Sequence, residues 1–327
     1  MRLLFITDHR YHKPFDSVYA LAAWVDSIEG IDAYVSSIGT SDNTSRMKQA
    51  PFTYISAVRP NQNLVYQKRR SCFSTAPHCL PVTDFDVICL RVLPICITTL
   101  QSLEESFSHA RFINTVDGII KTESKEYLSN IAAHCPTLKV CHTIEQALEF
   151  ISRGPAVLKP RYGYGGYSNL LINDESLFDG ANTFPRSHLV SLLTEKFKCG
   201  ESYLAMEFLP RYVKGDKRIL VVNGSIVGAS LRVPQESWLC NISSGGKVLK
   251  ASVKQEERNA INQITPQLKQ EGITMYGVDT LENEQGHRQV TEINTCCPGG
   301  FHSISHTLGD PLIQAKTVQA FKGNLGI

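Results

Sequence analysis

Residues 215–229 read Gly-Asp-Lys-Arg-Ile-Leu-Val-Val-Asn-Gly-Ser-Ile-Val-Gly-Ala, and this stretch decides the fold. Two strand-like runs, 217–222 and 225–229, flank the dipeptide Asn223-Gly224. A type I′ turn needs two residues with positive φ, and the pair Asn-Gly adopts them readily. The stretch therefore predicts an antiparallel β-hairpin, with the charged run Lys214 to Arg218 at its mouth. That run is typical of a solvated turn, but an arginine there could also stabilise a transferring phosphoryl group.

A second hairpin is predicted downstream, from residues 274–281 and 288–294 across a polar loop. It places Asp279 and Glu292 on neighbouring strands, and Asn294 shares a face with Glu292 because side chains alternate along a strand. Two carboxylates and an amide are ligands suited to Mg²⁺ on nucleotide phosphates. The alternative is a solvent-facing edge strand. The apolar residues that alternate with the polar ones, and the Gly-rich loop that follows at 296–300, weigh against it.

Upstream, the strand 156–159 ends in Lys159 and runs into a glycine cluster at Gly163, Gly165 and Gly166. Glycines let backbone N–H groups approach phosphate oxygens, and a lysine adds a point charge. The spacing matches neither the Walker nor the Rossmann fingerprint. Taken alone, the cluster indicates a phosphate-binding loop or simply an ordinary loop.

The first third of the chain alternates strands and helices. Strands are predicted at 3–6, 87–90 and 111–114, and a helix at 17–28 that Asp16 or Ser17 would cap. This order favours an open α/β sheet. Residues 41–81 are polar and broken, which indicates a long loop or lid.

Two further helices are expected. One covers 123–133. The other begins at a capping box, Ser252-x-x-Gln255, and ends near Gln270 before Gly272. Ile261, Ile264 and Leu268 should face the core, and Pro266 should kink the helix.

Length, charge and composition argue against several other classes of protein. The chain has 327 residues, which suggests two domains, and its net charge of +2 gives no sign of a nucleic-acid partner. No apolar run is long enough for a signal peptide or a membrane span, so a cytoplasmic protein is expected. The ten cysteines are then reduced thiols, and the lack of a C-x-x-C pair leaves a zinc site little support.

Taken together, these motifs resemble those of ATP-grasp ligases, and in particular the bacterial glutathione synthetase family. The match is tight from about residue 156 onward and covers 215–224, Arg232-x-Pro234-Gln235, Asn241, Gly245-Gly246, Gly277-x-Asp279 and 291–294. Weaker matches to the family pattern lie upstream, at Asp16-Ser17, Arg91 with Pro94, Asn114 and Lys125. The resemblance implies an N-terminal α/β domain over 1–120 and an ATP-grasp module over 121–327. That module would have a small lid subdomain to about 205 and a large one from about 206.

The resemblance also implies a role for each matched residue. ATP would be bound by Lys125, Lys159, Gly163, Gly165, Gly166 and Asp216. The adenine base would contact a hinge segment formed by Glu207, Phe208 and Leu209. Mg²⁺, or alternatively Mn²⁺, would be held by Asp279, Glu292 and Asn294. Arg218, Arg232 and Asn241 would surround the γ-phosphate and an acyl-phosphate. The partners would be a small-molecule carboxylate and an amine, nominally γ-glutamylcysteine and glycine, with no nucleic acid or membrane, and the protein would form a homo-oligomer.

Two segments depart from the family pattern. Residues 236–240 lack the family's arginine and contain Trp238 and Leu239, and Cys296-Cys297-Pro298-Gly299-Gly300 replaces a Ser-Pro-Thr element. Both are expected near the acyl or acceptor site, so the glutathione pair is expected to be a poor one. Three alternatives remain open: a ligase for another amino acid or small carboxylate, a ligase that modifies a protein terminus, and a catalytically silent nucleotide-binding regulator.

Overall fold

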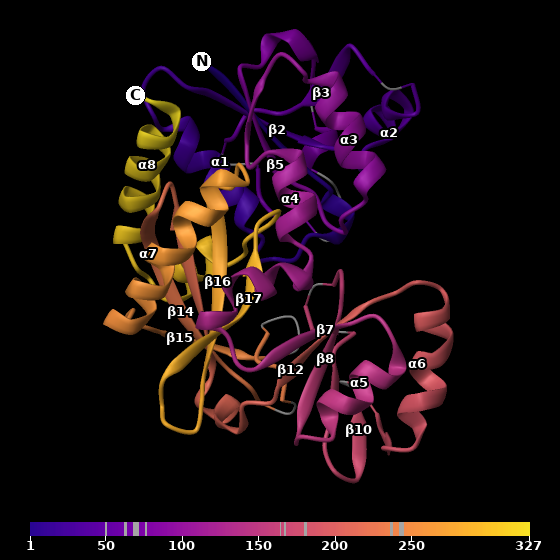
Figure 1. Cartoon of the computed structure of the whole chain (residues 1–327). Coiled ribbons are helices and arrows are strands. Elements are labelled where there is room, and N and C mark those ends of the chain that lie inside the picture. The colour runs from indigo at the N-terminus through magenta and orange to yellow at the C-terminus, as the bar shows by residue number, and fades with distance from the viewer. Residues whose placement is uncertain are drawn as a thin grey trace.

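The computed structural model describes most of the chain. The described residues are 1–49, 51–61, 64–67, 72–75, 77–163, 165–166, 168–179, 182–235, 238–241 and 245–327. The predicted mixed α/β fold is confirmed, with three main sheets that form an upper, a left-hand and a lower layer in Figure 1. None of the helices in this described part combines the length and the hydrophobicity that a membrane span requires.

The first sheet is parallel and open, as predicted. Its strand order is β2-β1-β5-β6, with β1 at Arg2–Thr7, β2 at Asp32–Ser37, β5 at Val87–Arg91 and β6 at Arg111–Ile113. The helices of this part are α1 (Ser17–Asp26), α2 (Ser41–Met47), α3 (Ile97–Ser106) and α4 (Val116–Thr122). Asp16 caps α1 by accepting a hydrogen bond from the Val18 N–H.

The prediction of a long loop over 41–81 is wrong in part. This stretch contains α2 and an antiparallel pair, β3 (Tyr54–Ala57) and β4 (His78–Pro81). Thr40 caps α2. The buried Asn43 on that helix donates to the Ser56 carbonyl and accepts from the Ser56 N–H, which fastens the helix to β3. Residues 50, 62–63, 68–71 and 76 of this stretch lie outside the described part. Among the described residues, the polar side chain of Asn43 pairs with backbone groups, so polar composition here accompanies regular structure.

The lower layer is an antiparallel sheet of order β11-β10-β9-β8-β12-β7. Its strands are β7 (Leu138–Cys141), β8 (Ala156–Pro160), β9 (Leu170–Ile172), β10 (Ser176–Phe178), β11 (Thr183–Pro185) and β12 (Tyr203–Glu207). Helices α5 (Ile144–Ile151) and α6 (His188–Lys198) accompany it. Side chains such as Phe150, Leu158 and Leu193 form a hydrophobic cluster of their own within this unit.

The third sheet, of order β15-β14-β13-β16-β17, contains both predicted hairpins. Its strands are β13 (Asp216–Val222), β14 (Ser225–Val233), β15 (Lys247–Lys250), β16 (Met275–Glu282) and β17 (Arg288–Asn294), with helices α7 (Gln255–Gln270) and α8 (Leu312–Leu325). Asn223 and Gly224 have φ values of 49° and 80°, so the turn between β13 and β14 has the positive φ values that the sequence predicts.

The predicted N-cap residue of α7 is wrong. Lys254, not Ser252, precedes the first helical residue, and the buried Glu257 carboxylate accepts a hydrogen bond from the Lys254 N–H. Ile261, Ile264 and Leu268 are buried as expected. The helix predicted over 123–133 is instead a 3₁₀ segment at Lys125–His134 with a non-helical Ile131.

One core joins the first sheet to the third. Ile88 and Leu90 of β5 belong to the same buried cluster as Ile264 and Leu268 of α7. Asn114 adds a polar clamp at this junction, because its side chain donates to the carbonyls of Met275 and Thr295 and accepts from the Thr274 and Met275 N–H groups. Asn114, which directly follows β6, therefore holds the first sheet to the residues where β16 begins and where β17 ends.

Candidate active site

Asp279 of β16 and Glu292 of β17 pair directly across the second hairpin, as predicted. Asn294 follows on the same strand, and its Nδ2 lies 3.4 Å from Asp279 Oδ2. Asp279 is 1% exposed. The three candidate metal ligands therefore lie together on one face of the third sheet.

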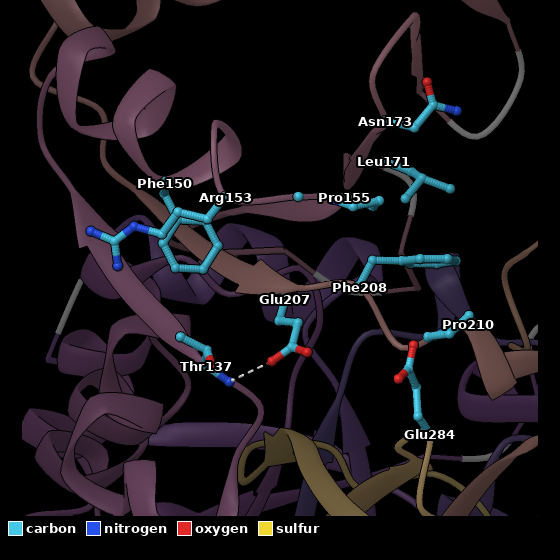
Figure 2. Close-up of a pocket in the computed structure, with 11 residues that line it drawn as sticks. Thr137, Phe150, Arg153, Pro155, Leu171, Asn173, Glu207, Phe208, Pro210 and Glu284 are labelled. Carbon is cyan, nitrogen blue, oxygen red and sulfur yellow. Dashed lines mark hydrogen bonds between the residues drawn. The ribbon is translucent and has the colours of Figure 1, made fainter.

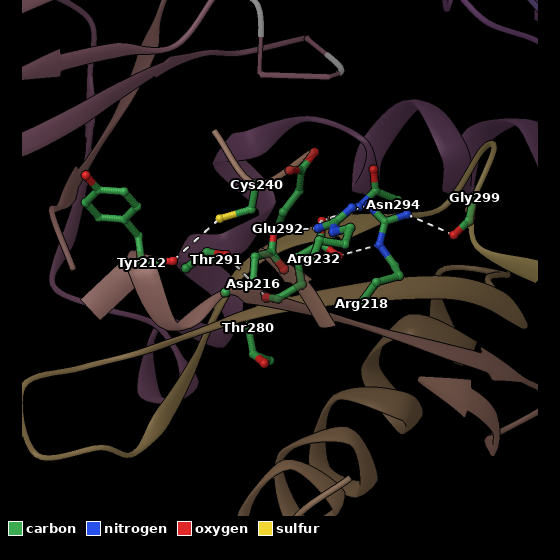
Figure 3. Close-up of polar contacts among 12 residues, drawn as sticks. Tyr212, Asp216, Arg218, Arg232, Cys240, Thr280, Thr291, Glu292, Asn294 and Gly299 are labelled. Atoms are coloured by element: carbon green, nitrogen blue, oxygen red, sulfur yellow. Dashed lines mark hydrogen bonds and ion pairs between the residues drawn. The ribbon is translucent and has the colours of Figure 1, made fainter. Parts of the chain in front are cut away.

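Two arginines from the first hairpin, Arg218 and Arg232, form ion pairs with Asp279. Figure 3 shows both arginines near Asn294 and Glu292. Arg218 donates from Nη2 to Asp279 Oδ2 at 2.8 Å and from Nε to Oδ1, and Arg232 Nη2 lies 2.9 Å from Oδ2. Burial alone would raise the pKa of Asp279, but the two guanidinium groups outweigh it and hold that pKa well below its ordinary value. Asp279 is therefore ionised and can serve as a ligand at any physiological pH.

Two buried lysines approach the same face from other elements. Lys125 Nζ lies 2.6 Å from Glu292 Oε1, and Lys159 Nζ donates to the Thr291 carbonyl at 2.7 Å. Burial alone would raise the pKa of Glu292, but Lys125 lowers it below its ordinary value. Burial has the opposite effect on a lysine, and it lowers the pKa of Lys159. The site therefore gathers two carboxylates and four cations, and each carboxylate contacts at least one of the cations.

A cavity lies between the lower and the third sheet, beside these charges. Its lining includes seven of the predicted residues, namely Lys159, Glu207, Phe208, Leu209, Asp216, Asn241 and Glu292. Two of the predicted glycines, Gly163 and Gly166, line a small adjoining pocket together with Lys125 and Glu292. Asp216 Oδ1 and Arg232 Nε are buried without a hydrogen-bond partner among the described residues. The geometry therefore leaves polar groups available to a polar ligand here.

The segment predicted as a hinge lies between two cavities. Glu207 and Phe208 also line a cavity of about 640 Å³ together with Phe150, Arg153 and Glu284 (Figure 2). The Glu207 carboxylate faces this larger cavity, where Oε2 lies 3.4 Å from the Thr137 N–H. Glu207 thus lines both cavities, and its carboxylate is directed toward the larger one.

A third cavity, of about 450 Å³, lies on the other side of Arg218 and Arg232, toward the first sheet. Its lining includes Arg91 and the loop residues Asp16, Cys297 and Gly299. Asn241, Arg218 and Arg232, which the sequence predicts at the reacting centre, also line it. The charged cluster thus separates a cavity at the hinge from a cavity at the N-terminal loop.

The structure places the two altered segments beside different cavities. Trp238 and Leu239 line the hinge-side cavity with Lys159 and Asp216, and they do not line the 450 Å³ cavity. Leu239 packs so close to Gly166 that a Cβ there would lie 2.9 Å from Leu239 Cδ2. Residues 236 and 237 lie outside the described part. The expectation that the glutathione pair is a poor one also rests on the arginine that residues 236–240 lack, and it stays a prediction.

Three residues near the site were not predicted from the sequence, or were only weak matches to the family pattern. Glu123 is buried, and its Oε2 accepts from the Thr295 and Cys296 N–H groups, which fixes the chain directly after Asn294. Arg91 is buried at the end of β5 and lines the 450 Å³ cavity. His12 also lines this cavity. An isolated residue in a loop carries no periodic signal, so the sequence offered no sign of His12 or Glu123.

His12 belongs to a hydrogen-bond chain whose directions can be assigned. Thr7 Oγ1 donates to the Arg91 carbonyl, so it accepts from His12 Nε2 at 2.7 Å. The other ring nitrogen, Nδ1, then accepts from the Tyr19 hydroxyl at 2.8 Å. Burial lowers the pKa of His12 despite the opposing effect of Asp16, and a neutral ring fits both contacts.

This assignment predicts a pH effect on stability. The unfolded chain binds a proton on His12 below about pH 6.5 and the folded chain does not, so stability falls as the pH drops below that value. For this one group the slope is at most about 1.4 kcal/mol per pH unit. Urea unfolding between pH 7 and 5.5 should show a steeper loss for the native protein than for His12→Gln. Parallel slopes would contradict the neutral, buried ring.

Comparisons with known proteins agree with this geometry. Residues 124–309 match the family described as prokaryotic glutathione synthetase, ATP-grasp domain. The chain is 28% identical over 241 residues to a glutathione synthetase of Bradyrhizobium diazoefficiens, covering 72% of each protein. It is 29% identical over 234 residues to one of Agrobacterium fabrum, covering 70% of this chain and 69% of that protein.

Solved structures share the fold across the whole chain. D-cycloserine synthetase DcsG superposes with a TM-score of 0.69 at 14% identity, covering 99% of this chain and 100% of that one. A RiPP-associated ATP-grasp ligase of Chryseobacterium gregarium gives 0.62 at 14% identity, covering 99% and 97%. The predicted resemblance is thus confirmed, and the protein is an ATP-dependent, ADP-forming ligase that makes a C–N bond. The chain belongs to the prokaryotic glutathione synthetase ATP-grasp family.

Proposed function

We propose that this ligase joins a small carboxylate to an amine through an acyl-phosphate at the cluster of Asp279, Glu292, Arg218 and Arg232. The observation that carries the proposal is the position of this cluster between two cavities, one at the hinge and one at the N-terminal loop. ATP would occupy the first and the carboxylate the second. The γ-phosphate and the carboxylate then meet at the arginines.

The donor set fits a hard divalent ion. Asp279 and Glu292 supply carboxylates and Asn294 an amide oxygen. The ion pairs of the two carboxylates use only part of their lone pairs. We assign Mg²⁺ to these three residues. Bound there, the ion would neutralise phosphate charge as a Lewis acid. No described residue is required as a covalent nucleophile.

The reaction has two balanced steps. A carboxylate oxygen attacks the γ-phosphorus, the bond to the bridging oxygen breaks, and ADP leaves. The amine nitrogen then attacks the acyl carbon, the C–O bond to the phosphate breaks, inorganic phosphate leaves, and the nitrogen loses a proton to water. Arg218 and Arg232 would stabilise the transferring phosphoryl group, because their ion pairs to Asp279 already hold them in place. Asn241 lies between the two cavities and would contact the same group.

The lower sheet would act as the lid over the nucleotide, within the predicted small subdomain of residues 121–205. Support comes from the hydrophobic cluster that this unit forms of its own, while Leu204 and Met206 of β12 join it to the core shared by the other two sheets. Lys159 would contact the phosphates from this unit and Lys125 from the segment beside it. We place the protein in the reducing cytoplasm, since all ten cysteines are unbridged in the structure.

A screen for ADP and phosphate release tests the ligase proposal. Purified protein with ATP and Mg²⁺ is expected to release both only when a matching acid and amine are present together. The panel should include γ-glutamylcysteine with glycine, other amino acids and dipeptides, and small carboxylates. Phosphate release with the acid alone, without an amide product, would contradict C–N bond formation.

The lid assignment predicts a change in hydrogen exchange. Gly165 and Gly166 have positive φ values of 69° and 76° and lie on the loop that would close over the phosphates. A non-hydrolysable ATP analogue with Mg²⁺ should slow exchange over residues 161–169, whereas α8 should exchange unchanged. Equal exchange over 161–169 with and without the nucleotide would count against a phosphate lid.

A further inference from the structure

Trp238 lies in one of the two segments that depart from the family pattern, and it lines the hinge-side cavity. Its indole Nε1 is buried and has no hydrogen-bond partner among the described residues. An indole nitrogen can only donate, and leaving a buried N–H group unpaired is costly. Trp238 therefore presents an unused donor at the cavity to which we assign ATP.

The two residues after Trp238 hold the chain against this cavity. Leu239 is 7% exposed and packs on the loop that contains Gly166, where a Cβ on that glycine would lie 2.9 Å from Leu239 Cδ2. Cys240 is 6% exposed, and its Sγ lies 3.7 Å from the carbonyl oxygen of Tyr212, shortly after the hinge. The backbone beside Trp238 is thus packed on both sides, which keeps the indole at the cavity.

An acceptor in the same cavity is also unused. Asp216 Oδ1 is buried without a hydrogen-bond partner among the described residues, whereas Asp216 Oδ2 pairs with Arg232. Burial raises the pKa of Asp216 to about 6, which leaves its carboxylate largely ionised at pH 7.5. Trp238 and Asp216 thus offer a donor and an acceptor that do not satisfy each other.

We propose that Trp238 binds the sugar of the nucleotide, with its indole N–H donating to a ribose hydroxyl. This proposal rests on the nucleotide position proposed above. A hydroxyl accepts one hydrogen bond while it donates another, so the two ribose hydroxyls can serve both Trp238 and Asp216. A phosphate oxygen can accept from Trp238, but it has no proton for Asp216 and would face a like charge there. The contact makes the enzyme discriminate ribonucleotides from deoxyribonucleotides.

Tryptophan emission tests the position of the contact without turnover. The chain has two tryptophans, and the other one, Trp24, is 5% exposed in the buried cluster that contains Leu3 and Phe5 of β1. ADP with Mg²⁺ is expected to change the emission of the native protein and of Trp24→Phe, but not that of Trp238→Phe. A change that persists in Trp238→Phe would contradict the position, as would unchanged emission of the native protein while calorimetry shows that ADP binds.

Calorimetric titration at pH 7.5 measures the hydrogen bond itself. Four nucleotides serve as probes, each with Mg²⁺: ADP, 2′-deoxy-ADP, 3′-deoxy-ADP and ADPαS, in which sulfur replaces a non-bridging oxygen of the α-phosphate. Trp238→Phe keeps an aromatic ring and removes the N–H. It should weaken ADP by about three- to tenfold, the range for one neutral hydrogen bond.

The loss should depend on the probe, which a merely structural role of Trp238 would not produce. Trp238→Phe should weaken the deoxynucleotide that lacks the contacted hydroxyl by less than about twofold, and the other deoxynucleotide and ADPαS as much as ADP. The matched control is Trp24→Phe, which makes the same chemical change in the core. It should leave the affinity for all four probes within about twofold.

Three results would overturn the ribose contact. ADP affinity within about twofold of native in Trp238→Phe would show that the N–H makes no contact, and an equal loss for all four probes would show that Trp238 only supports the cavity wall. A loss that disappears with ADPαS but remains with both deoxynucleotides would move the contact to the α-phosphate. If the native protein binds none of the four, the proposed nucleotide position falls as well. The ligase proposal fails separately, if no acid and amine pair yields ADP, phosphate and an amide.

Discussion

Replacing Glu292 with glutamine is expected to lower kcat on the order of 10³-fold, the upper range for losing one electrostatic contact to a transition state. Glutamine keeps the size of the side chain and removes the charge that would face Mg²⁺. Its amide oxygen can still accept the hydrogen bond that Lys125 Nζ now donates to Glu292 Oε1 at 2.6 Å. The fold should therefore persist, and steady-state kinetics with the best acid and amine pair measures the effect.

The control for this variant is Glu284→Gln in the loop between β16 and β17. Glu284 lines the 640 Å³ cavity and is exposed, so the same chemical change there should alter kcat by less than about twofold. A near-normal kcat in Glu292→Gln, with unchanged melting, would refute the metal assignment. A large fall in melting temperature would instead show that the Lys125 pair is chiefly structural.

The charge balance of the site explains why its ligands remain together before the nucleotide binds. Asp279 is flanked by Arg218 and Arg232, and Glu292 by Lys125. Without these cations, the buried Asp279 carboxylate would lie close to the half-buried Glu292 carboxylate, and two like charges so placed are costly. The cations that we assign to phosphate and acyl-phosphate thus first stabilise the free enzyme. Binding of the metal–nucleotide complex then exchanges internal ion pairs for contacts to the ligand.

The hairpins and the pairing of the two carboxylates could be predicted because their signals are local. The turn at Asn223-Gly224 follows from positive φ preferences, and the pairing of Asp279 with Glu292 follows from alternation along two strands. The start of α7 was misplaced because two capping patterns overlap. Glu257 stabilises the later one, since it also contacts Lys217 Nζ at 2.6 Å. That tertiary contact is invisible in a local motif.

The 450 Å³ cavity could not be predicted from the sequence. Its walls bring together the loop before α1, the end of β5 and the loop after β17, which lie far apart along the chain. Only packing of the first sheet against the third places Asp16, Arg91 and Gly299 around one space. The cavity that Trp238 and Leu239 line could not be predicted for the same reason, because position in a family pattern does not decide which side of a segment faces which cavity.

The second large effect is expected at the clamp between these sheets. Asn114→Ala should lower the free energy of unfolding by about 3–5 kcal/mol, because four hydrogen bonds of a residue that is 2% exposed are lost and buried N–H and C=O groups remain unpaired. Alanine also disfavours the φ of 58° at this position. Chemical denaturation measures the total change.

Asn114→Gly separates the two causes. Glycine accepts the positive φ but makes no side-chain hydrogen bond, so the part of the loss that it shares with alanine belongs to the clamp. The clamp holds Thr274 and Met275, where β16 begins, and Thr295, which follows Asn294. Glycine should therefore also weaken binding of ADP with Mg²⁺, since both metal-ligand strands lose their anchor. If glycine restores native stability and nucleotide affinity, only the backbone conformation matters, and the first sheet does not position the metal ligands through Asn114.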